Sequence, residues 1–345
     1  MWENELLYLS IATVIILVIQ SLILLYLIIR KSYEIRVGLK VDKHKKRYNE
    51  RLMSYLIDGE VSRVSLPNTN EKKRALEELL SKYAEILEGK EEKKNLFFLV
   101  DLYLADYYKD LLKSNKWSKR MNALYHIEEF NILTLENEVI NVIKKKRVTK
   151  DEIVHGLRIL SLFQNKNIFN ELAINHTQLS EYDYRSILFV GNENHLDMFV
   201  LGFHNCQPAL KNAILDMIGL KKELKYSPFL ESVFKSSSGE ERLRALKALA
   251  AIGYVKDISK YLPLCKSSNW QERMMIAKLL GKVKEKESIS CLRDLLHDSI
   301  WYVRSQAAQA IKHFPNGQTI LKDIYNTSND HFAKDMAWEW INKGD

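Results

Sequence analysis

The chain has 345 residues but only 12 glycines and 5 prolines, which leaves little material for the turns of β-hairpins. Hydrophobic residues make up 46% and charged residues 28%, a balance that excludes a largely disordered chain. The net charge of +8 is local, because nine basic and three acidic residues from Arg30 to Arg51 give +6 and leave +2 for the rest. A protein of this size that binds nucleic acid along an extended surface would spread positive charge over that surface, so we expect no nucleic-acid partner.

Residues 6–29 contain no charged side chain and predict a transmembrane helix. At about 1.5 Å per residue such a helix is long enough to cross a hydrocarbon core with some tilt. The alternative is a cleaved signal peptide, which has a basic start, a shorter apolar core and a small-residue cleavage site. Here residues 1–5 form a short acidic tail, and Arg30 and Lys31 follow the span. We therefore expect an uncleaved anchor.

The basic residues follow the span and none precedes it, so the positive-inside rule predicts a single-pass cell-membrane protein with its N-terminus outside and residues 30–345 in the cytoplasm. Three cysteines far apart in sequence fit reduced thiols buried in apolar helices of a cytoplasmic domain: Cys206, Cys265 and Cys291.

Residues 30–70 are expected to form a basic juxtamembrane stalk and linker. This segment sets the topology and can also bind anionic lipid headgroups. The candidate membrane-surface residues are Arg30, Lys31, Arg36, Lys40, Lys43, Lys45, Lys46 and Arg47.

Residues 71–116 predict an N-terminal cap of two helices. Asn70 suits a helix N-cap, and Gly89 suits the position just after a helix end. The second stretch, residues 96–112, is apolar around most of its circumference and should be buried between neighbours.

Residues 117–345 predict a solenoid of helical hairpins. Trp270, Arg273 and Leu280 each have a counterpart 31 positions later, and a fixed period of this length is typical of stacked repeats. The register between residues 131 and 205 stays open. A basic residue recurs at spacings of 31, 31, 31 and 30, at Lys211, Arg242, Arg273, Arg304 and Lys334. Six positions before four of them lie residues that suit helix N-caps: Ser236, Ser267, Asp298 and Ser328.

The stretch from Val303 to Ile311, V-R-x-x-A-A-x-A-I, resembles the second helix of HEAT repeats, of the short bacterial type also called lyase-type. The resemblance implies an all-α fold, an armadillo-type α-solenoid that follows the membrane helix. It also implies that the recurring basic residues form a structural ladder between consecutive repeats. A ladder that binds phosphates is the alternative.

No sequence motif of a known catalytic, metal or nucleotide site occurs in the chain. His195 and His204, with Cys206 nearby, come nearest to a metal pattern. Positions nine apart do not converge on one point of a helix, where residues three or four apart meet. We therefore expect no enzyme activity, no catalytic or metal-binding residue, no cofactor and no small-molecule substrate.

Trp270 and Trp301 begin equivalent predicted helices, with His331 at the next equivalent place. A tryptophan there either staples the hairpin or belongs to an exposed column that can act as a binding hot spot. The second interpretation predicts a protein-binding surface. Its polar rim would consist of Arg244, Lys247, Lys278, Gln306 and Gln309.

The predicted function is that of a membrane-anchored cytoplasmic scaffold or adaptor for a membrane-associated protein. Frequent lysine, isoleucine and asparagine are typical of an AT-rich bacterium, where an envelope or surface-polysaccharide synthesis system is a plausible client. Two alternatives remain open. One is a HEAT-type enzyme resembling phycobilisome lyases or DNA glycosylases, and the other is a lipid-binding stalk protein.

Overall fold

The computed structural model describes residues 2–58 and 67–343, and this part of the chain is helical and contains no β-strand. The predicted all-α fold is therefore confirmed. The contacts divide the chain into two compact units, Met1–Ile159 (unit 1) and Leu160–Asp345 (unit 2).

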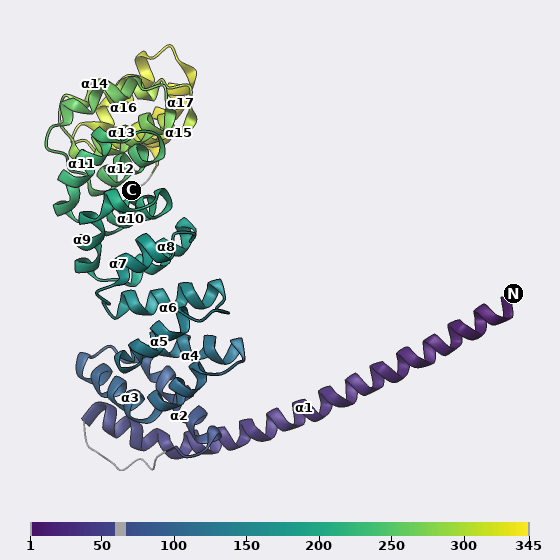
Figure 1. The fold of residues 1–345 in the computed structure, drawn as a ribbon. Helices are drawn as coiled ribbons and strands as arrows, with labels where there is room; N and C mark the ends of the chain where they lie inside the picture. Colours follow the sequence, from purple (N-terminus) through teal and green to yellow (C-terminus); the bar gives the residue numbers. More distant parts are fainter. Residues whose placement is uncertain (1, 59–66, 344–345) are drawn as a thin grey trace. The chain divides into compact units, whose positions relative to one another are not determined.

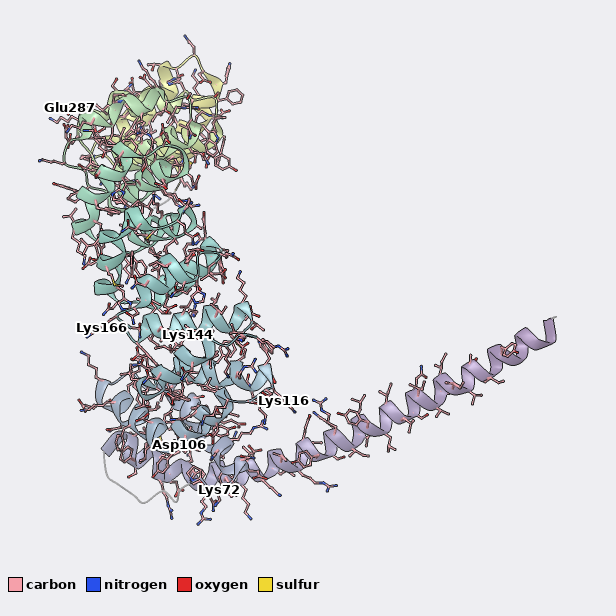
Figure 2. All side chains as sticks on the ribbon, in the orientation of Figure 1. Lys72, Asp106, Lys116, Lys144, Lys166 and Glu287 are labelled. Carbon is pink, nitrogen blue, oxygen red and sulfur yellow. A yellow bond between two sulfur atoms is a disulfide. The ribbon has the colours of Figure 1, made fainter. Side chains whose placement is uncertain are left out.

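The first helix of unit 1, α1 (Trp2–Asp58), runs without interruption for 57 residues (Figure 1). All side chains from Ile11 to Ile29 are exposed, although most of them are apolar. Figure 2 shows the side chains of this part of the helix projecting with no other element against them. A stretch within Ile11–Ile57 has a mean hydropathy of 2.8 and is not buried at all, so α1 is long and apolar enough to cross a membrane by length and composition.

The C-terminal part of α1 packs against α2 (Asn70–Ile86) and α3 (Lys90–Leu112). The side chains that make this contact are spaced by seven and four residues on one face of the helix, and all are buried: Val41, Tyr48, Leu52 and Leu56. The basic segment expected to be a stalk is thus helical up to Asp58, and the rest of the expected linker lies mostly outside the described residues.

Unit 1 continues with α4 (Trp117–Glu129), a 3₁₀ turn at Leu133–Leu135, α5 (Glu136–Ile143) and α6 (Lys150–Leu162), of which α6 reaches into unit 2. Arg120 of α4 forms a buried ion pair with Glu152 of α6 at 2.5 Å. The Glu152 carboxylate also accepts a hydrogen bond from the Thr149 backbone N–H at 3.1 Å, so the pair fixes the start of α6.

Unit 2 is a stack of helical hairpins, as the period predicts. The second helices of the hairpins, each packed on the next, are α8 (Glu181–Val190), α10 (Pro208–Lys221), α12 (Gly239–Ile252), α13 (Trp270–Val283), α15 (Trp301–Lys312) and α17 (His331–Asn342). The first helices are shorter, and some are replaced by 3₁₀ or π turns: α7 (Ile168–Asn170) with Glu171–Asn175, α9 (Glu193–Leu201) with Phe203–Asn205, Leu224–Tyr226 with α11 (Ser227–Ser236), Ile258–Lys260 with Leu262–Lys266, α14 (Ser288–Leu296) and α16 (Gly317–Thr327).

Small residues let the second helices approach closely. A Cβ atom added to Gly219 of α10 would lie 3.2 Å from the Ala248 Cα atom, and one added to Gly281 of α13 would lie 2.8 Å from the Ala310 Cα atom. The two pairs are 62 residues apart, or two periods, so the same close crossing occurs twice in the stack.

The second helices begin at Trp270, Trp301 and His331, as predicted, but the expected N-caps are wrong because each lies two residues before the observed one. The observed N-caps are Ser238, Asn269, Ile300 and Asp330. Three of the predicted residues instead accept a hydrogen bond from the backbone N–H two positions ahead, which closes a turn before the helix. These acceptors are the side chains of Ser267, Asp298 and Ser328.

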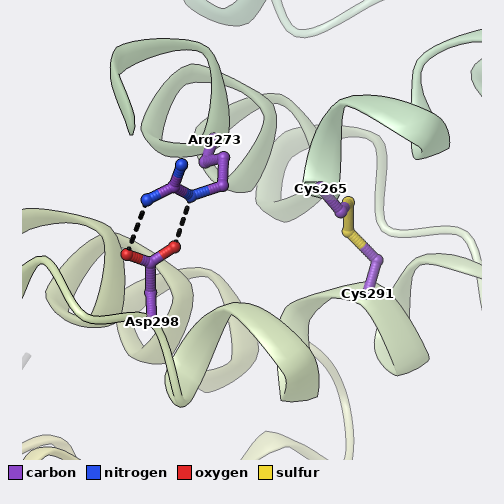
Figure 3. The surroundings of a disulfide bond; sticks show 4 residues. All are labelled: Cys265, Arg273, Cys291 and Asp298. Carbon is purple, nitrogen blue, oxygen red and sulfur yellow. Dashed lines mark hydrogen bonds and ion pairs between the residues drawn. A yellow bond between two sulfur atoms is a disulfide. The ribbon is translucent and has the colours of Figure 1, made fainter. Parts of the chain in front are cut away.

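Cys265 and Cys291 are joined by a disulfide with their Cα atoms 6.0 Å apart (Figure 3). The expectation of three reduced thiols is therefore wrong for these two, while Cys206 is free and buried. The 26 residues between them conceal their proximity, because the stacking of hairpins brings Leu262–Lys266 against α14. The cysteines consequently no longer argue for a cytoplasmic location.

Candidate functional site

Exposed aromatic side chains gather where the second helices of unit 2 begin. Trp270 at the start of α13 stacks on Tyr302 of α15, with ring centroids 5.9 Å apart, and Trp301 meets the same tyrosine edge-on at 5.3 Å. Trp301 and Tyr302 are at least half exposed, at 50% and 59%, and Trp270 is 36% exposed. We call Trp270, Trp301 and Tyr302 the aromatic edge. It offers rigid apolar surface of the kind that forms binding hot spots.

Two of the recurring basic residues, Arg242 and Arg273, form ion pairs that connect consecutive hairpins. Arg273 donates two hydrogen bonds to the Asp298 carboxylate, at 2.5 and 2.9 Å (Figure 3). It donates a third to the Ser267 carbonyl at 2.7 Å. Arg242 pairs with Glu272 at 2.8 Å. Such bonds use the donors that a phosphate would need.

The other three recurring basic residues make different contacts. Arg304 donates to the backbone carbonyls of Asp298 and Ser299, at 2.8 and 3.1 Å, and Lys211 lies 3.5 Å from Glu241. Lys334 forms no ion pair with a described residue.

A row of side chains with the 31-residue period lines two cavities along the second helices. The row is Arg185, Asp216, Lys247, Lys278 and Gln309. The first cavity, of about 300 Å³, is lined by residues of α8, α10, α12 and α13, and the second, of about 380 Å³, by residues of α13 and α15 and by Lys284 and His313 just beyond their ends. Both cavities include Lys278, so they adjoin, and we call them together the basic groove.

Carboxylates neutralise one end of the basic groove. Asp216 accepts hydrogen bonds from Arg244 at 2.5 Å and from Arg185 at 3.2 Å. Arg244 also pairs with Glu181 at 2.9 Å and with Glu240 at 2.7 Å. Arg244 is therefore occupied by three carboxylates and is not free to hold a ligand.

Lysines dominate the other end. Lys278 is half-buried, Lys282 and Lys284 are exposed, and none of the three forms an ion pair within the described parts of the chain. Beside them the Gln306 amide donates to Gln309 at 3.0 Å. The predicted rim residues thus lie in one groove, and Lys278 and Gln309 are at its less neutralised end.

The model of HEAT repeats matches residues 226–312 and, in an overlapping placement, residues 258–339. The chain is a helical repeat protein with HEAT repeats. The aromatic edge and the lysine-rich end of the basic groove lie within these HEAT repeats.

Among solved structures, the crystal structure of an engineered protein from a structural genomics consortium is similar to 81% of this chain over 88% of its own length. It is 16% identical in sequence and has a TM-score of 0.39. No curated protein matches the sequence.

Sequence reasoning missed Tyr302, Arg185 and Asp216. Tyr302 has no aromatic counterpart in α13, where Gln271 follows Trp270, so the period gave no signal. Arg185 and Asp216 do follow the period backwards from Lys247, at exact multiples of 31 residues. Arg185 was missed because the register between residues 131 and 205 stayed open, whereas Asp216 lies within the assigned register but is an acid where Lys247 and Lys278 are bases.

The candidate membrane-surface residues all lie on α1. Seven of the eight are exposed, and Lys45 is the exception because it pairs with Glu78 of α2 at 2.6 Å. Arg30 pairs with Glu34 on the same helix at 3.1 Å. The remaining exposed cations leave a basic helical surface next to the apolar half of α1.

Unit 1 contains a cluster of titratable side chains around His126. The His126 Nδ1 atom lies 2.9 Å from Glu129, its Nε2 atom lies 3.2 Å from Glu77, and the Tyr108 hydroxyl donates to Glu77 at 2.8 Å. Burial alone would lower the pKa of His126, but the two carboxylates raise it on balance. The described residues hold no group of three or more histidine, cysteine, aspartate or glutamate side chains arranged for a metal ion.

Proposed function

We propose that this protein is a membrane-anchored scaffold that binds a protein partner through the HEAT repeats of unit 2. The observation that carries the proposal is that one chain has two exposed apolar surfaces. The side chains from Ile11 to Ile29 in the apolar half of α1 are all exposed, and the aromatic edge is exposed on the repeats.

The exposed apolar side chains of α1 favour an environment that shields them from water. An uncharged stretch with every described side chain exposed would be costly in water, and its length suits a bilayer. The exposed cations that follow it on α1 suit anionic headgroups at the membrane surface. Confinement to a membrane raises the effective concentration of the HEAT repeats for partners in the same membrane.

The proposed orientation has the N-terminus outside and the HEAT repeats in the cytoplasm, on the strength of the charges that flank the apolar stretch. The client in this proposal is a membrane-associated protein, with an envelope or surface-polysaccharide synthesis system as the expected setting. Nothing in the geometry of the described residues favours a reaction at the aromatic edge or in the basic groove, so the scaffold role is preferred over the enzyme. The exposed aromatic edge, which a lipid-binding stalk would not need, favours the scaffold over the stalk protein.

The test is co-purification from membranes. The full chain is expressed with its α1 helix, crosslinked and isolated, and the proteins bound to it are compared with those bound to a Trp270→Ala/Trp301→Ala variant. Both side chains are exposed, so the variant should fold, as its circular dichroism spectrum will show. A membrane protein held by the parent chain and lost from the folded variant supports the proposal, and identical sets of bound proteins contradict it.

A further inference from the structure

The floor of the basic groove is made of small residues. Gly219, Ala248, Gly281 and Ala310 lie where adjacent second helices approach closely, and all four line its cavities. Because these residues have small side chains or none, they form the bottom of the groove, and the longer side chains of the 31-residue row form its sides. The repeat geometry therefore produces a channel that runs across successive hairpins.

The charges of the groove are unbalanced along its length. Asp216 is the acid in its lining, and it is already shared between Arg185, Arg244 and Lys247, the last at 3.9 Å. Toward α15 the lining holds Lys278, Lys282 and Lys284, none of them in an ion pair with a described carboxylate. Lysine ammonium groups brought together without counter-charges attract anionic ligands, and the half-buried Lys278 is screened less by solvent than the exposed pair.

The same end of the groove can also bind a peptide backbone. Gln306 and Gln309 share one hydrogen bond of 3.0 Å and keep further amide donors and acceptors. A peptide group presents one donor and one acceptor and so matches them, whereas a phosphate presents acceptors alone. Nucleic acid gains its affinity by neutralising many phosphates, and three lysines offer few such contacts.

We infer that the basic groove binds a short acidic peptide segment of the partner protein, with its carboxylates on Lys278 and Lys282 and its backbone on Gln306 and Gln309. This inference rests on the proposed scaffold function and names the chemistry of the partner. The aromatic edge at the start of α13 and α15 then supplies apolar contacts, and the groove along the same helices selects for charge.

The probe is fluorescein-labelled hexaglutamate, added to the full chain in lipid nanodiscs. Its affinity is measured by fluorescence anisotropy, and the lysines that it meets are mapped by carbodiimide coupling and mass spectrometry. Lys278→Glu/Lys282→Glu is compared with Lys256→Glu/Lys322→Glu, which changes the net charge equally at exposed positions outside the groove lining.

We expect the groove variant to weaken hexaglutamate binding about tenfold, because two charge-assisted contacts become repulsive, and the control variant to change it less than about twofold. Coupling should concentrate on Lys247, Lys278 and Lys282. If the charge reversal prevents folding, Lys278→Gln/Lys282→Gln is used, with the same direction expected. Equal losses in both variants, coupling spread over α1 and the surface, or tighter binding of an oligothymidylate than of hexaglutamate would each overturn the inference.

The inference about the basic groove and the proposed scaffold function can be contradicted by different results. In one case, the co-purified protein is lost from the Trp270→Ala/Trp301→Ala variant but kept by Lys278→Glu/Lys282→Glu, and hexaglutamate does not bind. The inference that the groove binds an acidic segment is then wrong, while the scaffold function is still supported. If no protein depends on the aromatic edge, the scaffold function itself fails.

Discussion

Ion pairs between side chains of neighbouring repeats help to hold the stack together. The Arg273–Asp298 pair links two consecutive hairpins through a fork of hydrogen bonds, and both side chains are largely buried. Burial alone would raise the pKa of Asp298, but the bonds from Arg273 and from the Ile300 backbone N–H lower it on balance. The Arg293–Asp323 pair has similar chemistry on an exposed surface, so it serves as a comparison.

Asp298→Asn should lower the free energy of unfolding by about 3 kcal/mol, because it leaves the largely buried Arg273 guanidinium without a counter-charge. Asp323→Asn should cost less than about 1 kcal/mol, because the Arg293–Asp323 pair is exposed. Denaturant unfolding followed by tryptophan fluorescence compares the two variants. Equal effects would show that the buried pair does not hold the repeats together.

The His126 cluster predicts a stability that depends on pH. The pKa of His126 in the folded chain is raised above its ordinary value of 6.5, so its stabilising charge is fully present below pH 6.5 and is lost as the pH rises through the raised pKa. We expect the melting temperature of the parent chain to fall over that range relative to His126→Gln. A parallel pH profile for the two proteins would contradict this assignment.

At the scale of helices and repeats, the sequence predicted some features of the structure and not others. The 31-residue period predicted the stacked second helices, since an apolar stripe and a recurring arginine are visible without coordinates. The N-caps were expected two residues too early, because Ser267 and Asp298 close turns as readily as they cap helices. The Cys265–Cys291 bond was not predictable, because their contact depends on how hairpins stack.

Helix ends carry a second repeated feature. Lys222, Gly253 and Lys284 follow α10, α12 and α13 at intervals of 31 residues, and all three adopt positive φ angles of 57°, 80° and 59°. Glycine takes this left-handed conformation without strain, whereas lysine does so at a cost. At the next equivalent place stands Pro315, which cannot adopt it, and α15 ends earlier, at Lys312.

Lys284→Gly should therefore raise the free energy of unfolding by about 1 kcal/mol through relief of backbone strain. Lys286→Gly, two residues along the same loop and without a positive φ angle, should give no gain. Thermal unfolding of both variants tests this expectation, and a gain in neither of them would mean that position 284 is not strained.

The whole chain joins an apolar helix to a stack of HEAT repeats, and two of its features point to opposite sides of a membrane. In the proposed orientation the flanking charges would place unit 2 in the cytoplasm, whereas disulfides are rare there. In the cytoplasm, Cys265 and Cys291 would be reduced in cells and would form their bond only after oxidation.

Alkylation of acid-quenched cells with a mass-tagged maleimide tests the orientation. The cytoplasmic placement predicts that both cysteines are modified in the denatured chain without prior reduction, along with Cys206. A Cys291→Ser variant identifies their bands. If Cys265 and Cys291 react only after reduction, unit 2 lies on the oxidising side and the proposed orientation is reversed.

The most direct measurement is photo-crosslinking in intact membranes. A photoreactive phenylalanine analogue replaces Tyr302 at the centre of the aromatic edge, and Tyr325 of α16, another exposed tyrosine of unit 2, serves as the control position. We expect the chain in the membrane fraction and a discrete protein adduct at position 302 that is absent at position 325. A chain recovered in the soluble fraction, or the same adducts at both positions, would contradict a membrane-held scaffold that binds its partner through this edge.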